Sequence, residues 1–454
     1  MSRPRLPLDD RLDSTRIDSV SRRDFLRAAV AAGTCLPAGL EIVANPARAA
    51  DDKPRSANDK LNLAIIGVAA KGRDNLNNVA SENIVAICDI DAKRLDDVAK
   101  IYPAAQKFDD WRKAIDVKGL DGVVISTPDH THAGPTLASL QRGLAVYCEK
   151  PLTHTVAEAR KVGEFTKRYK NVTQMGTQIH AGDNYRRVVE MVQGGVIGPV
   201  TRVHVWLASS VPAFKKPAPD AMPPEHVKYD LWLGPAPYRP FSEAHFHFNW
   251  RYWWDFGGGS MADFFCHYCD LAFWALGLTQ PTSVVCSRAE KVHDGDNEPP
   301  TRMQVDYQFP ARGDQPAVAL TWYQGGWKPE GADMYGKSSA VLFEGRDGRI
   351  LADYGTNKVF MQEGKELKKV EPSIPSSIGH WKEWIEATKT KGPTTCNFAY
   401  ASNLTESALL GNVSLKAGMK TLDWKADTMK IPGAADAEQF LTKEYRKGWE
   451  LPTG

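Results

Sequence analysis

The chain has 454 residues, of which 42% are hydrophobic and 25% are charged, a globular composition long enough for two domains. After Ala49 the basic and acidic side chains number 49 each, so no overall field draws the protein to nucleic acid or anionic lipid, which argues against both partners. The longest nearly uncharged apolar stretch, Ala28–Leu40, has 13 residues, fewer than the roughly 20 that a membrane-spanning helix needs.

The first 49 residues have the order of an export signal. The pair Arg22-Arg23 directly precedes a weakly hydrophobic segment rich in alanine and glycine, and Ala47-Arg48-Ala49 then supplies a small-x-small cleavage site. This order resembles a twin-arginine signal, by which folded proteins are exported. An amphipathic helix with a chance arginine pair is the alternative. We expect a signal peptide over residues 1–49 and a periplasmic mature protein.

Residues 58–180 alternate strand and helix patterns. Continuous apolar runs, typical of strands buried on both faces, occur at Leu61–Gly67, Ile84–Asp89, Gly122–Thr127, Val146–Lys150 and Val172–Met175. Helical patterns lie between them at Ala92–Ile101, Ala133–Arg142 and Val156–Arg168. The alternation predicts an α/β domain with a doubly wound parallel sheet, in which ligands bind outside the carboxyl ends of the strands.

A glycine-rich segment follows the first of these strands. Residues 67–72 fit the dinucleotide-binding pattern G-x-G-x-x-G, with Ala69 in place of the middle glycine. Gly67 permits the tight turn and Gly72 the close packing of helix on strand, while the backbone near Ala69 would approach a pyrophosphate at the helix N-terminus.

Asp89 closes the second strand, 22 residues after Gly67. A carboxylate at this position would hold the adenosine ribose hydroxyls and repel a 2′-phosphate. We therefore predict NAD as the ligand in preference to NADP. The alternative role for Asp89 is to cap the helix that begins at Ala92, and the two roles are compatible.

Residues 181–454 have a different pattern. Thr201–Leu207 alternates apolar and polar residues, as a half-exposed strand does. Further strands are expected at Thr282–Ser287, Met303–Phe309, Ala317–Tyr323, Ala340–Glu344 and Lys358–Gln362, with short turns that favour antiparallel pairing. Helices are expected at Ser260–Leu276, Trp381–Thr388 and Glu406–Ala417.

Lys150 is a candidate acid or base. Pro151 disfavours helical geometry at Lys150, so the side chain should project from the strand end into the predicted crevice. A cationic nicotinamide ring ~5 Å away would lower the pKa of a lysine from about 10.4 toward about 8, within reach of neutral pH. The alternative is a surface pair of Glu149 and Lys150 at a turn.

Asp263 and His267 are four residues apart and so share one face of the helix that Ser260 opens. His267 is a candidate for proton transfer, and Asp263 for orienting the imidazole or the substrate. The alternatives are a capping box formed by Ser260 and Asp263 and a hydrogen-bonded core histidine.

The segment His245–Trp254 is unusually aromatic, which suits either the faces of a sugar ring or core packing between domains. We predict no metal site. The histidines at 245, 247 and 267 lack a carboxylate at matching spacing, and Cys266-x-x-Cys269 lacks a second cysteine pair. The six cysteines after residue 49 are too few for a disulfide scaffold.

Taken together, the ordered motifs resemble the Gfo/Idh/MocA oxidoreductase family. The resemblance rests on Gly67–Gly72, Ser126–His132, Cys148–Pro151, Gly176–Gln178, Trp232–Pro237, Gly257–Gly259, Asp263-x-x-x-His267 and Tyr445–Trp449. It implies an N-terminal Rossmann domain and a C-terminal domain whose open, mostly antiparallel sheet shapes the substrate site, with C-terminal helices that return to the first domain. It also implies a homo-oligomer.

The resemblance assigns roles residue by residue. The catalytic set would be Lys150, Asp263 and His267. The cofactor-binding set would be Gly67, Ala69, Gly72, Asp89, Thr127, Pro128, His132, Glu149 and Lys150. One position departs from the pattern, because Phe265 stands where the family commonly has glycine, and a ring there could narrow the pocket or displace the helix.

The expected function is that of an exported NAD(P)-dependent oxidoreductase that transfers hydride between nicotinamide and a hydroxyl or keto carbon of a sugar or cyclitol derivative. One alternative is an NAD-dependent glycoside hydrolase or epimerase that recycles its cofactor in each turnover. Another, motivated by Ala69 and Phe265, is a non-catalytic sugar-binding protein with a vestigial nucleotide site.

Overall fold

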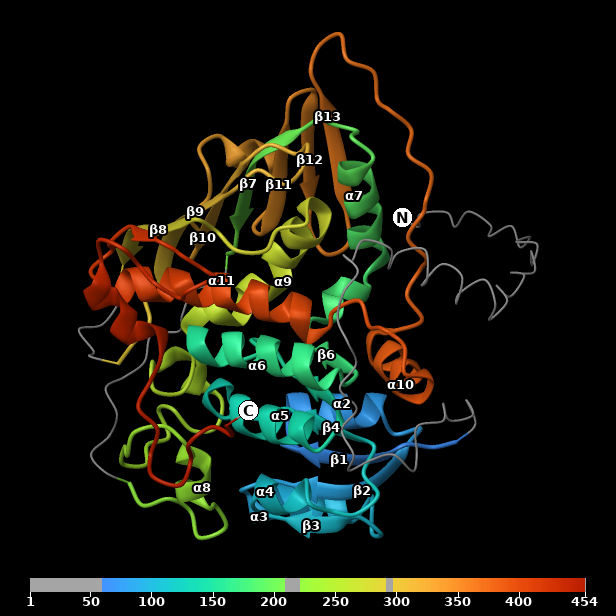
Figure 1. The fold of residues 1–454 in the computed structure, drawn as a ribbon, viewed down its shortest axis with the longest axis vertical. Helices are drawn as coiled ribbons and strands as arrows, with labels where there is room; N and C mark the ends of the chain where they lie inside the picture. Colours follow the sequence, from blue (N-terminus) through green and yellow to red (C-terminus); the bar gives the residue numbers. More distant parts are fainter. Residues whose placement is uncertain (1–58, 209–220, 291–296, 454) are drawn as a thin grey trace, which may run out of the picture. The chain divides into compact units, whose positions relative to one another are not determined.

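A computed structural model of the protein describes residues 59–208, 221–290 and 297–453, all within one unit that spans residues 54–454. The first sheet has six parallel strands in the order β3-β2-β1-β4-β5-β6 (Figure 1). These strands are β1 (Asn62–Ile66), β2 (Asn83–Cys88), β3 (Gln106–Phe108), β4 (Gly122–Ile125), β5 (Ala145–Cys148) and β6 (Thr173–Met175). The predicted doubly wound parallel sheet is confirmed.

Helices cover both faces of this sheet, which is why its strands are apolar on both sides. In β1, Leu63 and Ile65 belong to one hydrophobic cluster, and Ala64 and Ile66 belong to another. The first cluster includes residues of α2 (Lys71–Asn78), α3 (Ala92–Ala99) and α10 (His380–Thr390), and the second includes residues of α4 (Trp111–Ala114), α5 (Ala133–Gln141) and α6 (Val156–Tyr169). A helix from near the end of the chain thus helps to cover the first sheet.

The second sheet has eight strands in the order β13-β12-β11-β7-β10-β9-β8-β14. They are β7 (Val200–Trp206), β8 (Ser283–Glu290), β9 (Arg302–Phe309), β10 (Val318–Gln324), β11 (Ala340–Gly345), β12 (Gly348–Ala352), β13 (Asn357–Met361) and β14 (Leu422–Asp423). The pair β7–β10 is parallel and the other pairs are antiparallel, so the predicted mostly antiparallel sheet is confirmed.

Two long helices connect the sheets. Helix α9 (Gly259–Leu276) packs on β7 and β11 and beside α7 (Asp183–Gln193), and α11 (Phe398–Lys416) packs against both α9 and α6 (Figure 1). The shorter helices are α8 (Tyr229–Leu233), η2 (Asp129–Thr131), η3 (Gln178–Ala181), η4 (Asn249–Tyr252), η5 (Ala332–Tyr335) and η6 (Ala435–Leu441). The amino end of α9 therefore faces the carboxyl ends of the first sheet, and side chains of both halves meet there.

No helix in the described part of the chain is both long and apolar enough to span a bilayer. The predicted signal peptide, residues 1–49, lies outside the described residues.

Candidate active site

A cleft of about 520 Å³ lies at the carboxyl ends of β1, β2, β4 and β5. Its walls come from the first sheet with its loops and from the second half of the chain, which contributes Leu231, Trp232, His247, Phe248, Trp250, Arg251, His267 and Trp449. The predicted site residues that line it are Gly67, Ala69, Asp89, Thr127, Pro128, His132, Glu149, Lys150 and His267. Gly72 lies beneath the loop, and Asp263 reaches the cleft through its contact with Lys150.

The two glycines of the fingerprint are sterically required. Gly67 has a φ of +81°, and a Cβ there would lie 2.7 Å from the carbonyl oxygen of Ser126. A Cβ on Gly72 would lie 1.9 Å from the carbonyl oxygen of Gly67, so only glycine lets α2 start so close to β1. Ala69 needs no such freedom, because the positive φ values in this turn fall on Gly67, at +81°, and on Ala70, at +46°.

The same loop presents unused backbone donors. Within the described residues the N–H groups of Ala69, Ala70 and Lys71 donate no hydrogen bond, as is usual in the first turn of a helix. They lie at the N-terminus of α2, where the helix dipole favours an anion. A pyrophosphate fits this position, and alanine at residue 69 leaves it intact.

Asp89 is tied to the glycine-rich loop. Its Oδ2 accepts a hydrogen bond from the N–H of Val68 at 3.0 Å, and its Oδ1 accepts one from the N–H of Asp91 at 3.0 Å. Burial raises the pKa of Asp89 against the effect of these two bonds. The alternative capping role is wrong for this residue, since Asp91 caps α3 by accepting from Lys93 and Arg94.

Lys150 and Asp263 form an ion pair inside the cleft. The Lys150 ammonium donates to the Asp263 carboxylate and, at 2.9 Å, to the Asp263 backbone carbonyl. Burial disfavours the charge on Lys150, but the Asp263 carboxylate outweighs it and raises the pKa of the lysine. Burial acts against the charge of Asp263 as well, yet Lys150 and Arg251 lower the pKa of that carboxyl group.

The predicted lowering of the Lys150 pKa assumed a nearby nicotinamide cation, and it stays a prediction for the NAD-loaded protein. That prediction did not include Asp263, 113 residues further along the chain, whose carboxylate raises the pKa of Lys150 in the protein alone. The alternative of a surface Glu149–Lys150 pair is wrong. The Glu149 carboxylate is buried and accepts from Asn75 at 2.9 Å and from Gln178 at 3.2 Å.

His267 lies one turn after Asp263 on the same face of α9, as predicted. Its Nδ1 is buried and has no hydrogen-bond partner within the described residues. Burial, assisted by the charge of Lys150, lowers the pKa of His267 to about 3, so the imidazole is neutral. The proposed capping box is wrong, because α9 is preceded by Gly258 without a side-chain cap and Ser260 lies inside the helix.

Part of the cleft wall comes from the segment that follows β4, through Thr127, Pro128, Asp129, Thr131 and His132. The His132 ring lies between two backbone carbonyls, with Nε2 2.7 Å from Thr127 O and Nδ1 2.8 Å from Pro151 O, and so holds the Thr127–Pro128 turn against the strand end that bears Lys150. Its contacts make it a positioning residue. Asp129, next to Pro128, is 3% exposed and lines the cleft.

Two residues that line the cleft, Asp129 and Arg251, were not among the predicted site residues. Burial raises the pKa of Asp129 to about 8, although the nearby Arg251 opposes that shift. The Nε of Arg251 lies 3.8 Å from Oδ1 of Asp263. Both residues lie in segments that the sequence analysis singled out, the turn at 126–132 and the aromatic segment at 245–254, but no spacing rule selects them within those segments.

Phe265 does not narrow the cleft. Its ring is fully buried and packs 5.6 Å from the rings of both Tyr307 and Trp322, on the side of α9 that faces the second sheet. The aromatic segment divides between the two roles considered. Phe248 and Trp250 line the cleft, and Trp250 also belongs, with Trp253, to a separate hydrophobic cluster.

The histidines weighed as metal ligands do not converge. His245 bonds to Tyr229 at 2.9 Å, and His247 lies 3.3 Å from Asp91, whereas His267 is on α9. Within the described ranges the one group with converging ligand atoms is His180, Asp270 and Cys396.

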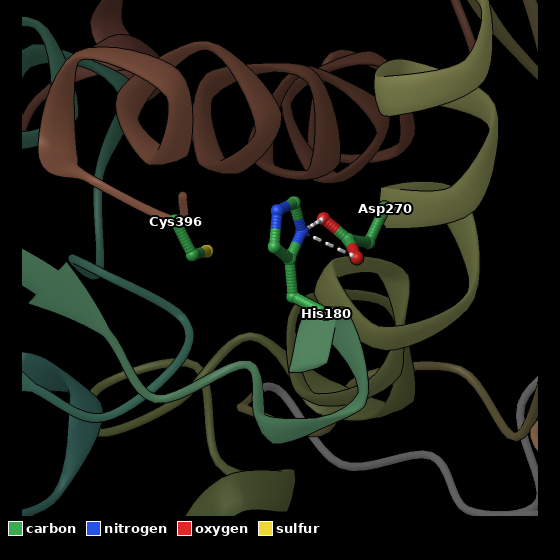
Figure 2. A group of neighbouring side chains, drawn as sticks. All are labelled: His180, Asp270 and Cys396. Carbon is green, nitrogen blue, oxygen red and sulfur yellow. Dashed lines mark hydrogen bonds and ion pairs between the residues drawn. The ribbon is translucent and has the colours of Figure 1, made fainter. Parts of the chain in front are cut away.

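Figure 2 shows the imidazole of His180 standing between the sulfur of Cys396 and the carboxylate of Asp270. The Nδ1 of His180 lies 2.9 and 3.0 Å from the two oxygens of Asp270, and Tyr400 donates to Oδ1 at 2.7 Å. The ring also stacks on Trp274 at 4.0 Å. These contacts engage the Asp270 carboxylate in hydrogen bonds within the protein, and they hold η3 against α9 and α11.

The glycine-rich turn at the carboxyl end of β1 has free backbone N–H donors, and a lysine–carboxylate pair lies at the same cleft. Together these features are those of a nucleotide-dependent oxidoreductase of the Rossmann type. Residues 61–177 match the oxidoreductase family with an NAD-binding Rossmann fold, Gfo/Idh/MocA, and residues 213–451 match the C-terminal alpha/beta domain of the same family. The chain belongs to the Gfo/Idh/MocA family.

Similar proteins with assigned names are dehydrogenases. An inositol 2-dehydrogenase of Salmonella paratyphi B is 32% identical over 165 residues, which are 35% of this chain and 49% of that protein. One from Rhodococcus erythropolis is 27% identical over 154 residues, 33% of this chain and 44% of that protein. The chain therefore matches about half the length of these relatives.

Solved structures share the fold. The WlbA dehydrogenase of Chromobacterium violaceum, in complex with NADH and UDP-GlcNAcA, has a TM-score of 0.57 at 16% identity and covers 81% of this chain and 97% of its own. The aldose-aldose oxidoreductase of Caulobacter crescentus has a TM-score of 0.57 at 17% identity and covers 80% and 99%.

The residues present fit NAD. The unused N–H donors at Ala69–Lys71 suit the pyrophosphate, and Asp89 at the end of β2 suits the ribose hydroxyls. Thr127 and Pro128 line the path from there to Lys150, where the nicotinamide would lie.

Proposed function

We propose that this protein transfers hydride between NAD and a hydroxyl-bearing or keto carbon of a sugar or cyclitol derivative. The observation that carries the proposal is the position of Lys150, whose ammonium is held by Asp263 in the same cleft as the glycine-rich loop. His267 completes the group one helical turn away. The names inositol 2-dehydrogenase and aldose-aldose oxidoreductase among similar proteins support a polyhydroxylated substrate.

The mechanism assigns separate tasks to three side chains. Bound NAD supplies the hydride acceptor, and its reduced form the donor for the reverse reaction. Lys150, kept ionised by Asp263, donates a hydrogen bond to the reacting oxygen and stabilises negative charge on it. The neutral imidazole of His267, which lines the cleft, takes the hydroxyl proton during oxidation and returns it during reduction.

One observation favours a second candidate, glycoside cleavage or epimerisation with an internally recycled cofactor. The segment 226–228 pairs with the end of β2, through Ala92 N–H to His226 O at 2.9 Å and Lys228 N–H to Ile90 O at 2.8 Å. His247 adds a contact to Asp91 at 3.3 Å. His247 lines the cleft, and its contact with Asp91 on the adenosine side would slow release of NAD, which recycling requires.

The experiment begins with the purified protein. Denaturation should release NAD, or the protein should take it up, and a panel of sugars and cyclitols offered to the NAD-loaded protein should yield reduced cofactor. Lys150→Met should lower that rate by about 10²–10³-fold with NAD binding unchanged, because it removes the ammonium that stabilises negative charge on the reacting oxygen. Lys425→Met, at an exposed surface pair, is the control and should behave as the parent.

Each other outcome has a meaning. Glycoside turnover without net reduction, lost in Lys150→Met, would favour the recycling candidate. Full activity of Lys150→Met would overturn the role given to Lys150. Failure to bind NAD at all would overturn the whole proposal and leave the non-catalytic sugar-binding alternative.

We also propose export by the twin-arginine pathway, which would carry the folded protein with its nucleotide to the periplasm. The order of Arg22-Arg23, the apolar segment and Ala47-Arg48-Ala49 supports this. Replacing both Arg22 and Arg23 with lysine should retain the protein in the cytoplasmic fraction at its unprocessed length. Unchanged export of that variant would contradict the proposal.

A further inference from the structure

The substrate end of the cleft holds more positive than negative charge. Lys150 and Arg251 are cationic there, and Asp263 is the ionised carboxylate between them. Asp129 is largely protonated near neutral pH, because burial raises its pKa to about 8, and His267 is neutral. Two cations thus face one anion where the substrate must bind.

Glu149 does not change this balance. Its carboxylate is bonded to Asn75 and Gln178 on the cofactor side, and Lys71 is the cation that most favours its charge. Oxidised nicotinamide would add a further positive charge beside Lys150. The two negative charges of the diphosphate would lie at the glycine-rich loop. At the substrate end of the cleft the charge balance therefore favours an anionic substrate over a neutral one.

Arg251 is held in place and has donors to spare. Its guanidinium carbon lies 4.3 Å from the ring centre of Trp250 and 4.7 Å from that of Phe248, and Nη1 donates to Phe248 O at 3.2 Å. Gly257 lets the chain approach closely, since a Cβ there would lie 2.8 Å from the Cα of Arg251.

The Nε of Arg251 lies 3.8 Å from Oδ1 of Asp263, which is longer than a hydrogen bond. The Nη2 of Arg251 forms no hydrogen bond within the described part of the chain. The side chain is 23% exposed and lines the cleft. A guanidinium packed between aromatic rings with a free edge is suited to grip a carboxylate in two-point fashion.

We infer that the substrate is a carboxylated carbohydrate, a uronate or an aldonate, whose carboxylate binds Arg251 while its reacting hydroxyl lies between Lys150 and His267. The inference rests on the proposed function and narrows its substrate class. A single carboxylate matches the one net charge of the protein groups, and packing on Phe248 and Trp250 keeps the guanidinium directed into the cleft instead of folded onto Asp263.

The test compares matched acids and neutral sugars on the NAD-loaded full chain. D-glucuronate with D-glucose, D-galacturonate with D-galactose and D-gluconate with D-glucitol are offered, and both calorimetric binding and reduced cofactor are measured. The acid of at least one pair should bind about 10- to 100-fold more tightly than its neutral partner, as a charge-assisted contact predicts.

Arg251→Gln should abolish that preference by raising the KM and Kd for the acid, with NAD binding unchanged. Arg251→Lys should restore part of it, because the charge returns without the planar fork. Arg239→Gln is the matched control. Arg239 packs on Trp253 and pairs with Asp255, is 25% exposed and does not line the cleft, so the preference should persist in that variant.

The outcomes separate the two proposals. Reduced cofactor from neutral sugars, with equal or weaker binding of all three acids, would overturn the carboxylate inference and leave the proposed function intact. Binding of an acid that depends on Arg251 but gives no reduced cofactor would support the inference and overturn the proposed function. An acid preference that survives in Arg251→Gln would overturn the assignment to that residue.

Discussion

Replacing Asp129 with asparagine should change how the stability of this protein depends on pH. The carboxyl group of Asp129 is 3% exposed, and burial raises its pKa from 3.8 to about 8, with Arg251 and Lys150 acting in the opposite direction. The folded protein therefore keeps a proton on Asp129 at pH values where the unfolded chain has lost it. Because proton binding and folding are linked, the free energy of unfolding must fall as the pH rises through that interval.

The magnitude follows from the width of the interval. One pKa unit corresponds to about 1.4 kcal/mol, so between pH 6 and the folded pKa of about 8 this carboxyl group costs the native state an additional 2–3 kcal/mol or so. Above pH 8 the cost is constant, since the group is ionised in both states. Asparagine has the same shape as aspartic acid but does not titrate. The free energy of unfolding of Asp129→Asn should therefore lack this part of the pH dependence.

The assay is urea unfolding of the nucleotide-free protein at pH 6 and pH 9, followed by tryptophan fluorescence. The unfolding free energy of Asp129→Asn relative to the parent should rise by about 2–3 kcal/mol from pH 6 to pH 9. Asp314→Asn, at an exposed position, should show no such change. Parallel pH profiles for the parent and Asp129→Asn would refute the reasoning.

Two further changes test other parts of the structure. Gly72→Ala should abolish NAD binding, because the new Cβ would lie 1.9 Å from the carbonyl oxygen of Gly67. Binding is measured by quenching of tryptophan fluorescence, and wild-type affinity in the variant would show that the loop has another shape. Lys389→Met should lower the unfolding free energy by about 3–5 kcal/mol, because it strips a buried partner, 2.9 Å away, from Glu82. Lys382→Met, an exposed lysine on the same helix, is its control, and equal urea midpoints for the two variants would contradict the prediction.

The sequence predicts the strands of the first sheet well, because strands covered on both faces are continuous apolar runs. It does not predict β3 (Gln106–Phe108), because this strand has only three residues, the first two of which are polar, and it pairs only with β2 at the edge of the sheet. Helix α11 starts at Phe398, earlier than the predicted Glu406, since Asn397 caps it. Its first turns carry buried Ser402 and Thr405, and such polar residues hide the helical pattern.

The site was predictable where one local rule decides it. Glycines at 67 and 72 follow from the steric demands of the turn. What the sequence could not supply are the partners from distant segments, such as the pairing of Lys150 with Asp263 across 113 residues, which raises the pKa of the lysine in the protein without NAD. The capping of α3 by Asp91 instead of Asp89 was also out of reach, because both carboxylates precede the helix within three residues.

The central claim is that NAD lies in this cleft with its ribose on Asp89. The most direct measurement is a calorimetric titration of NAD into the nucleotide-free protein and into Asp89→Ala. The account predicts one site per chain in the parent and at least tenfold weaker binding in Asp89→Ala, equivalent to a loss of about 1.4 kcal/mol or more. Equal affinity in the two proteins, or no binding to the parent, would contradict it.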